Sequence, residues 1–181
     1  MTDAPDPAGE ERGLLAAEIA RVALLHGDFL LSSGRRSSWY LDKYRFETDP
    51  KLLGRIAVGL ARELDPGIDR LAGPELGAVA LVTALALETG LPFVIVRKAA
   101  KDHGGSRDIE GVLQPGDRVA VVEDVITSGG QALAAAQRVT AAGGQVRQIL
   151  AVVDRGEGGE EAIVADGYRL SALVHRSDLP G

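Results

Sequence analysis

The sequence contains no cysteine, which excludes disulfide bonds, a thiolate nucleophile and any cysteine-bound metal site. It has no apolar run long enough to span a bilayer, and the acidic, proline-containing residues 1–12 are unlike a signal peptide. An excess of positive charge is also missing. The net charge of −6 argues against a general nucleic-acid binder, which needs a basic face for backbone phosphates. Together these absences predict a soluble cytoplasmic protein.

The composition is that of an ordinary globular chain. With 181 residues, 45% of them hydrophobic and 25% charged, the sequence is long enough for one well-buried domain. Residues 1–12 show no apolar periodicity, so we expect a disordered tail there. Residues 13–181 are then expected to form the single domain.

The first part of this domain is expected to form a small accessory lobe. Apolar spacing predicts an amphipathic helix over 14–25, ended by Gly27. Residues 29–32 and 39–41 are typical of two short strands around a turn at 33–37, and they predict a β-hairpin. Asp49 and Pro50 then favour a helix start, and this helix should run to about Leu64.

Strands and helices alternate from about 68 to 153. Strands are predicted at 68–72, 93–97, 119–122 and 146–153, with an Ala/Leu-rich helix ending at Gly90 and another over 131–142. Such alternation indicates an α/β fold with a parallel sheet flanked by helices. Short β segments are expected near 162–164 and 168–175.

The stretch 119–131 carries the clearest chemistry. A buried strand is followed by Glu123 and Asp124, then by Thr127, Ser128 and two glycines that lead into a helix. Backbone N–H groups at a helix start favour a phosphate, whereas carboxylates accept hydrogen bonds from sugar hydroxyls and can help hold Mg²⁺. A lone acidic pair could equally cap a turn. Joined to the hydroxyl and glycine residues, it predicts a site for a phosphorylated sugar.

Three further segments are expected beside this stretch, because ligands of such sheets bind beyond the carboxyl ends of the strands. They are the tight loop 73–77, the basic, glycine-containing loop 98–110 and Arg155. Basic residues in a loop are usually just solvated. At the ligand-binding edge of an acidic protein, we expect them to contact an anion instead.

These segments resemble the type I phosphoribosyltransferases and, within them, the orotate phosphoribosyltransferase family. The resemblance covers nearly everything from about residue 14 and lies in Val121-Val-Glu-Asp-Val-Ile-Thr-Ser-Gly-Gly130, Phe29-Leu-Leu-Ser-Ser-Gly-Arg-Arg-Ser37, Arg97-Lys-Ala-Ala-Lys-Asp-His-Gly104 and Asp154-Arg155. The family pattern implies a core of approximately 46–155 and a hood of approximately 13–45 plus 156–181. It also implies a homodimer with active sites shared across the interface.

The resemblance implies a reaction and the residues that serve it. Orotate and phosphoribosyl pyrophosphate (PRPP) would give orotidine 5′-monophosphate and pyrophosphate, with Mg²⁺, in de novo pyrimidine biosynthesis. Magnesium would be held mainly through PRPP, with Glu123 and Asp124 as candidate ligands. The implied catalytic residues are Lys101, His103 and Asp124. Implied PRPP contacts are Leu76, Gly77, Arg97, Lys98, Lys101, His103, Glu123, Asp124, Val125, Ile126, Thr127, Ser128, Gly129, Gly130 and Gln131. Implied orotate contacts are Tyr40, Leu41, Thr127 and Arg155.

Some positions depart from the family pattern, and two other functions stay open. Ser38 stands where a proline is common, Ala99 where an acid is frequent, and Ser32 where some members carry a lysine near pyrophosphate. The alternatives are a phosphoribosyltransferase for uracil or a purine, and a PRPP-sensing regulator without turnover. Arg155 favours a carboxylate-bearing base over the first alternative. The cationic loop favours an enzyme over the second.

Overall fold

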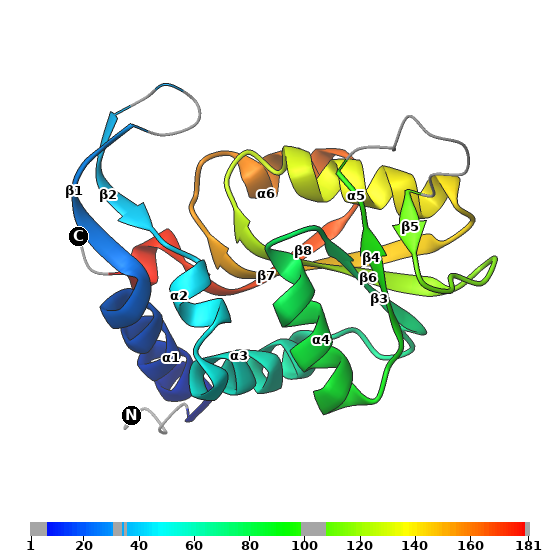
Figure 1. Cartoon of the computed structure of the whole chain (residues 1–181), viewed down its shortest axis with the longest axis horizontal. Coiled ribbons are helices and arrows are strands. Elements are labelled where there is room, and N and C mark those ends of the chain that lie inside the picture. The colour runs from blue at the N-terminus through cyan, green and yellow to red at the C-terminus, as the bar shows by residue number, and fades with distance from the viewer. Residues whose placement is uncertain (1–6, 31–33, 35, 99–107, 180–181) are drawn as a thin grey trace, which may run out of the picture.

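A six-stranded sheet forms the centre of the molecule (Figure 1), in the order β5-β4-β3-β6-β7-β8. The computed structural model describes residues 7–30, 34, 36–98 and 108–179. The strands are β3 (Arg70–Pro74), β4 (Phe93–Val96), β5 (Ile109–Glu110), β6 (Arg118–Ile126), β7 (Gln145–Asp154) and β8 (Arg169–His175). Neighbours pair in parallel except β4 and β5, which are antiparallel. The predicted α/β fold with a parallel sheet is confirmed, and β5 is a short addition at its edge.

Helices cover both faces of this sheet (Figure 1). On one face lie α1 (Pro7–Ala23), α3 (Pro50–Glu63) and α4 (Ala78–Thr89), and on the other lie α5 (Gly130–Ala141) and α6 (Gly159–Ala165). The side chains of β6 alternate between the two cores, as the pleat of a strand requires: Ala120 and Val122 join the first, Val119 and Val121 the second. Burial on both faces explains why this strand is a continuous apolar run.

The point where the chain reverses its direction across the sheet lies between β3 and β6. From β3 the chain continues through α4 to β4 on one side, whereas β6 pairs with β3 on the other side. The loops that follow β3 and β6 therefore diverge to opposite faces and leave a crevice between them, which is the ligand-binding position in open α/β sheets.

Two helix boundaries follow the local signals in the sequence. Asp49 caps α3, and its carboxylate accepts hydrogen bonds from the backbone N–H of Lys51 (2.9 Å) and Leu52 (3.1 Å), with Pro50 in the first turn. Gly90 ends α4 in the left-handed conformation, with φ of 72°. Both boundaries were expected from the sequence.

The N-terminal helix differs from the prediction at both ends. Residues 7–12, expected in a disordered tail, belong to α1, and Gly27 does not end this helix. Leu24 and Leu25 instead belong to strand β1 (Leu24–Leu30), paired with Leu41 and Tyr40. Locally, Leu24 and Leu25 fit the apolar pattern of a helix as well as that of a strand. Their pairing with Leu41 and Tyr40 across the hairpin decides in favour of the strand.

The predicted hairpin is present but longer, and it stands out from the body of the molecule (Figure 1). It consists of β1 and β2 (Arg36–Leu41), which pair only with each other. The short helix α2 (Tyr44–Glu47), which the sequence did not signal, connects the hairpin to α3. The hairpin and the main sheet are thus joined through a compact turn that also carries Lys43, just before α2.

The C-terminal part contains one wrong assignment. Residues 162–164, expected as a β segment, lie in α6, because Gly158 and Gly159 start a helix there and Ile163 is buried against the sheet. The second predicted segment is confirmed as β8. Although it falls within 156–181, the range expected in the hood, β8 pairs with β7 in the main sheet. The chain then ends its described part with a 3-10 turn (Arg176–Asp178).

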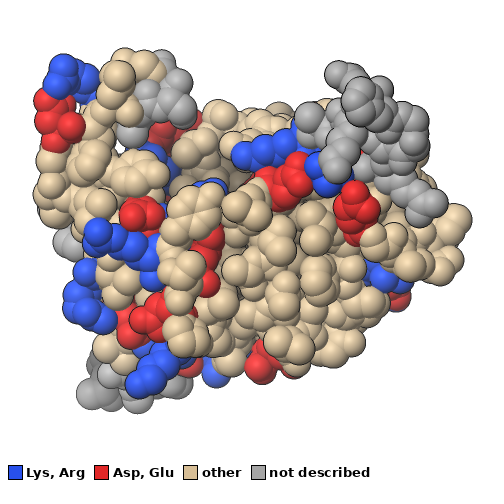
Figure 2. All heavy atoms as spheres, in the orientation of Figure 1, with Lys and Arg blue, Asp and Glu red and all other residues tan. Residues whose placement is uncertain are grey.

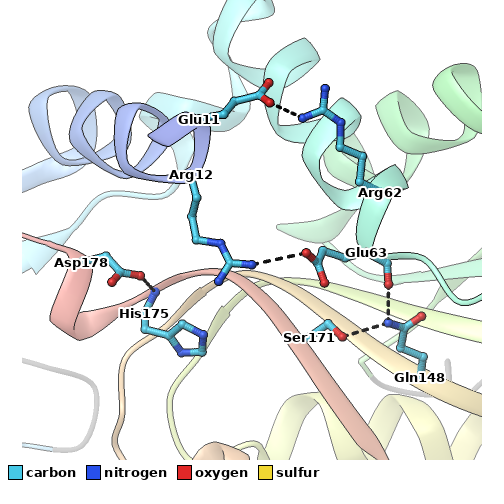
Figure 3. A network of polar contacts seen from close by, with 8 residues as sticks. All are labelled: Glu11, Arg12, Arg62, Glu63, Gln148, Ser171, His175 and Asp178. Carbon is cyan, nitrogen blue, oxygen red and sulfur yellow. Dashed lines mark hydrogen bonds and ion pairs between the residues drawn. The ribbon is translucent and has the colours of Figure 1, made fainter. Parts of the chain in front are cut away.

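A polar network fixes α1 and α3 to the sheet (Figure 3). Gln148, fully buried in β7, donates through Nε2 to the backbone oxygen of Glu63 (2.7 Å) and to Ser171 Oγ (3.0 Å). Its Oε1 accepts from the backbone N–H of Asp65 (2.9 Å). Arg12 of α1 reaches the carboxylate of Glu63 at 3.4 Å. A buried amide with every polar atom paired specifies one register between helix and strand.

The opposite end of the sheet from the crevice carries an ion pair suited to a stability test. Arg70 Nε lies 2.5 Å from Asp117 Oδ2, and Gln114 N–H donates to the same oxygen at 2.9 Å. Burial alone would raise the pKa of Asp117, but these hydrogen bonds outweigh it and lower the pKa below its ordinary 3.8. A lowered carboxyl pKa stabilises the fold above the unfolded pKa, and this stabilisation is lost as the pH falls.

We therefore expect Asp117→Asn to lower the free energy of unfolding at pH 7 by about 1 kcal/mol, a shift in Tm of a few degrees. The deficit relative to the parent protein should shrink as the pH falls below about 4, and the turnover rate should not change. Thermal melts at several pH values measure this. A deficit that is constant across the pH range would contradict the assigned role of the Asp117 charge.

Charged side chains of both signs lie close together on one face of the molecule. On the face shown in Figure 2, the described Lys and Arg side chains lie next to Asp and Glu rather than in one broad basic patch. This distribution agrees with the acidic net charge of the sequence. Within the described ranges, none of the helices has the length and apolar character needed to cross a membrane.

Candidate active site

The motif loop after β6 forms a hollow of about 430 Å³ at the start of α5. Its lining comprises Glu123, Val125, Ile126, Thr127, Ser128, Gly129, Gly130, Gln131 and Ala132. None of the side chains that the structure describes caps α5, whose first N–H groups lie at the hollow without an intrahelical partner. A positive helix end with free donors and hydroxyls beside it is a site for a phosphate.

Two glycines let this loop approach α6 closely. Gly129 has φ of 78°, and a Cβ there would lie 3.0 Å from the backbone oxygen of Gly159. A Cβ on Gly159 would overlap Ile126 Cγ2 and lie 2.5 Å from the backbone oxygen of Thr127. The motif needs glycine at 129 for its backbone conformation. It also needs a glycine in α6, which sequence reasoning did not single out.

The two acids of the motif are buried, with 4% of each residue exposed. Asp124 Oδ2 forms an ion pair with Lys43, and Asp124 Oδ1 accepts from the backbone N–H of Val125 at 2.6 Å. Glu123 Oε1 is buried without a hydrogen-bond partner among the described residues. An unpaired acceptor in such a place fits a ligand that brings hydroxyl donors.

A third acid, Glu47 of α2, completes a buried cluster with Asp124 and Lys43. Burial, and next to it the charge of Asp124, raises the pKa of Glu47 to about 8, and the same causes raise the pKa of Glu123 to about 8. The Lys43 ammonium offsets part of both shifts. Neither Lys43 nor Glu47 could be predicted from the sequence, because neither belongs to a motif and the turn that brings them to the site is a tertiary feature.

The loop after β3 lies against this cluster, on the other side of the crevice. A Cβ on Gly77 would overlap Asp124 Oδ2 and lie 2.5 Å from Lys43 Nζ, so the Gly77 backbone is in direct contact with the acid and its counter-ion. The neighbouring peptide bond, Glu75–Leu76, is cis, and the Leu76 side chain is exposed. The structure thus brings together Gly77 and Asp124, which the sequence had placed in separate loops.

Glu75 ties the same loop to the start of the basic loop. Its Oε1 accepts from the backbone N–H of Lys98 at 2.9 Å, and its Oε2 lies 3.9 Å from Arg97 Nη2. Arg97 Nη1 also lies 3.5 Å from Glu110 Oε1, and the buried Nε of Arg97 has no hydrogen-bond partner in the part of the chain that the structure describes. Arg97 and Lys98 therefore lie beside Glu75, in the loop that also carries Leu76 and Gly77. Lys101 and His103 lie outside the described residues.

Arg155 follows β7 on the hairpin side of the motif. Its backbone N–H donates to the oxygen of Ile126 at 3.0 Å, which fixes it beside the motif strand. Its side chain is paired with Glu157 and lies over the ring of Trp39, with 4.2 Å from Cζ to the ring centroid. Trp39, for which the sequence motifs predicted no role, is thus in contact with the predicted base-binding arginine.

The two hairpin residues expected at the base pocket differ in accessibility. Tyr40 is 39% exposed and packs its ring against Phe29 at 5.6 Å between centroids. Leu41 is 4% exposed, and its side chain belongs to the main hydrophobic core. Of the pair, only the side chain of Tyr40 is open to a ligand.

Comparison with known proteins gives a consistent result. Residues 48–171 match the family model of the phosphoribosyl transferase domain. The chain is similar to the orotate phosphoribosyltransferase of Methanocella arvoryzae, with 45% identity over 88% of this chain and 91% of that protein. It is also similar to that of Pyrococcus furiosus, with 49% identity over 82% of this chain and 83% of that protein.

Solved structures agree with these sequence relatives. The crystal structure of Mycobacterium tuberculosis orotate phosphoribosyltransferase in complex with Fe(III) dicitrate aligns with a TM-score of 0.82 and 36% identity, over 94% of this chain and 99% of that one. The same enzyme in complex with PRPP aligns with a TM-score of 0.77 and 35% identity, over 93% of this chain and 98% of that one.

Proposed function

Because the chain belongs to the phosphoribosyl transferase domain family and, within it, to the orotate phosphoribosyltransferases, we propose how its own residues carry out the reaction. The chain transfers the 5-phosphoribosyl group of PRPP to orotate and releases pyrophosphate, a step of de novo pyrimidine biosynthesis. One observation carries the assignment of residues. The phosphate hollow, the buried acids and the Gly77 loop meet at the crevice between β3 and β6, and Arg155 lies beside the motif strand where β7 ends.

Each part of PRPP has a chemically matched partner in this crevice. The 5′-phosphate takes the N–H groups and hydroxyls of Thr127, Ser128, Gly129 and Gly130. The ribose hydroxyls take Glu123 and Asp124. The backbone at Leu76 and Gly77 holds the pyrophosphate, whose charge is neutralised by Arg97, Lys98, Lys101 and His103. Val125, Ile126 and Gln131 complete the walls of the hollow.

The chemistry needs no protein nucleophile. A ring nitrogen of orotate attacks the anomeric carbon while the bond from that carbon to the pyrophosphate oxygen breaks, and the proton of that nitrogen passes to the released pyrophosphate or to solvent. Positive charge builds on the ribose and negative charge on the leaving group, so a buried carboxylate near the sugar and cations near the pyrophosphate both stabilise the transition state. Lys43 and the Val125 N–H hold Asp124 in position to stabilise the positive charge on the ribose.

Magnesium is proposed to enter with PRPP. No group of three potential metal ligands occurs among the described residues, and Asp124 is already paired with Lys43. Glu123, whose buried Oε1 has no hydrogen-bond partner within the described ranges, is the better protein partner for a hydrated cation. When bound, the ion supplies charge neutralisation at the phosphates. The protein residues bind and orient the sugar and the base.

The base is recognised through Arg155, which we propose pairs with the orotate carboxylate. A guanidinium offers two parallel N–H donors to a carboxylate, a fit that lysine cannot reproduce. Tyr40 lies on the exposed side of the hairpin, and the backbones of Leu41 and Thr127 complete the proposed pocket. A base without a carboxylate, such as uracil or a purine, leaves the arginine without this partner.

Formation of orotidine monophosphate tests the reaction against the alternative of a PRPP sensor. The decrease in orotate absorbance on addition of PRPP and Mg²⁺ should be stoichiometric with pyrophosphate release. A sensor binds PRPP with no turnover of either substrate. The absence of both products at saturating substrates would therefore favour the sensor.

We further propose a cytoplasmic homodimer in which the basic loop of one subunit completes the site of the other. Co-expression of differently tagged Lys101→Ala and Asp124→Asn chains tests this arrangement. Each homodimer should be inactive, but the mixed dimer carries one intact site if the loop crosses the interface. We expect a random mixture to regain about a quarter of the parent activity. Regain of no activity, although mixed dimers are isolated, would place Lys101 and Asp124 in the same subunit's site.

A further inference from the structure

The guanidinium of Arg155 is held by an internal carboxylate. Its Nη2 lies 2.8 Å from Glu157 Oε1, and the side chain of Arg155 is 10% exposed. The Nε of Arg155 is buried and has no partner among the described residues. In arginine, Nε–H and one Nη2–H point the same way and form the edge that binds a carboxylate with two hydrogen bonds. Glu157 accepts from one donor of that edge, and no described residue accepts from the other.

The ring of Trp39 holds the same guanidinium from the hairpin. Arg155 Cζ lies 4.2 Å from the ring centroid, and Arg176 Cζ lies 4.9 Å from it. The backbone around Trp39 is itself fixed, because Ser37 Oγ donates to the Trp39 oxygen at 2.7 Å. A cation over an aromatic face keeps its plane and its position while its edge exchanges hydrogen-bond partners. Trp39 therefore fixes where the edge of Arg155 points.

We propose that Glu157 is a specificity-determining residue: it occupies the carboxylate-binding edge of Arg155 until the carboxylate of the base displaces it, while Trp39 holds the guanidinium in place. This proposal rests on the proposed function, in which Arg155 binds orotate. An anionic base replaces one carboxylate by another and fills the unpaired Nε as well. An uncharged base cannot replace the charge of Glu157, so the ion pair persists and excludes that base.

The proposal predicts opposite effects from the two residues around Arg155. Removing the charge of Glu157 removes the internal competitor, and removing the ring of Trp39 lets the guanidinium move away. Both changes act on the orotate side of the site. PRPP is bound by the hollow at 127–130, so the KM for PRPP should stay within about twofold in both variants.

The matched experiment compares Glu157→Gln with Glu160→Gln, which removes the same charge from an exposed position in the first turn of α6. We expect Glu157→Gln to lower the KM for orotate by about threefold to tenfold. The reason is that the orotate carboxylate no longer competes with a partly exposed Glu157 carboxylate for Arg155. It should also raise the use of uracil relative to orotate. Glu160→Gln should change neither value. Trp39→Leu should raise the KM for orotate, and Trp39→Phe should restore most of the loss.

An unchanged or raised KM for orotate in Glu157→Gln, with Glu160→Gln equal to the parent, would overturn the proposal. It would show that Glu157 supports Arg155 rather than competes with the substrate. Equal effects of Trp39→Leu on the KM values for orotate and PRPP would also contradict it, since they would indicate general damage to the site. If the parent protein does not turn over orotate, the proposed function itself fails. If the parent turns over orotate but Glu157→Gln does not lower the KM for orotate, only the role of Glu157 fails.

Discussion

Replacing Arg155 by alanine is expected to raise the KM for orotate by about 100-fold, because truncating one partner of a buried, hydrogen-bonded charge pair costs about 2–5 kcal/mol. The KM for PRPP should stay within about twofold of the parent value, since the phosphate hollow and the buried acids do not involve this side chain. Steady-state kinetics with each substrate varied in turn measure both values.

Two variants show whether the geometry of Arg155 matters as well as its charge. Arg155→Lys keeps the charge but offers no parallel pair of donors, so we expect an intermediate KM for orotate. Arg147→Ala removes an exposed arginine from the other end of β7 and should leave both KM values unchanged. A parallel rise in both KM values in Arg155→Ala would mean that this residue supports the site as a whole.

The substitution Gly77→Ala is expected to impair catalysis nearly as much as Arg155→Ala does. The Cβ of Gly77→Ala would overlap Asp124 Oδ2 and crowd Lys43 Nζ, so either the acid or the loop must move. Asp124 and the Gly77 loop hold different parts of PRPP in the proposed site. A displacement of about 1 Å at a reacting centre can cost about 100-fold in rate. We expect kcat/KM for PRPP to fall by about that factor while the protein stays folded.

Gly54→Ala is the matched control for this change. Gly54 lies in the middle of α3, and a Cβ there meets no atom within 4 Å. It should leave activity unchanged and stabilise the fold by up to about 1 kcal/mol, because alanine is the better helix former. Thermal melts of both variants separate loss of the site from loss of the fold. Full activity of Gly77→Ala would show that the two loops are not held in contact during the reaction.

The sheet and the phosphate hollow could be predicted because their signals are local. A buried apolar strand, an acidic pair and a glycine-containing helix start are contiguous in the sequence at 119–131, and the alternation around them sets the topology. The helix boundaries at Asp49 and Gly90 were predicted for the same reason, since a cap depends on a few adjacent residues.

The parts that could not be predicted depend on contacts between distant segments. Leu24 and Leu25 fit a helical pattern, but pairing with β2 places them in a strand. Residues 162–164 fit a short strand until Ile163 is seen buried as part of a helix. In the site, Lys43 and Trp39 acquire their roles only because the fold brings them to Asp124 and Arg155. No spacing in the sequence contains that information.

The most direct test of the account is the preference of the unmodified protein among free bases. With PRPP and Mg²⁺ present, kcat/KM is measured for orotate, for uracil and for a purine base. If Arg155 reads a carboxylate at the crevice beside the phosphate hollow, orotate should exceed the other bases by at least about 100-fold. Equal use of uracil and orotate would contradict the account, because the only chemical difference between them at that site is the carboxylate.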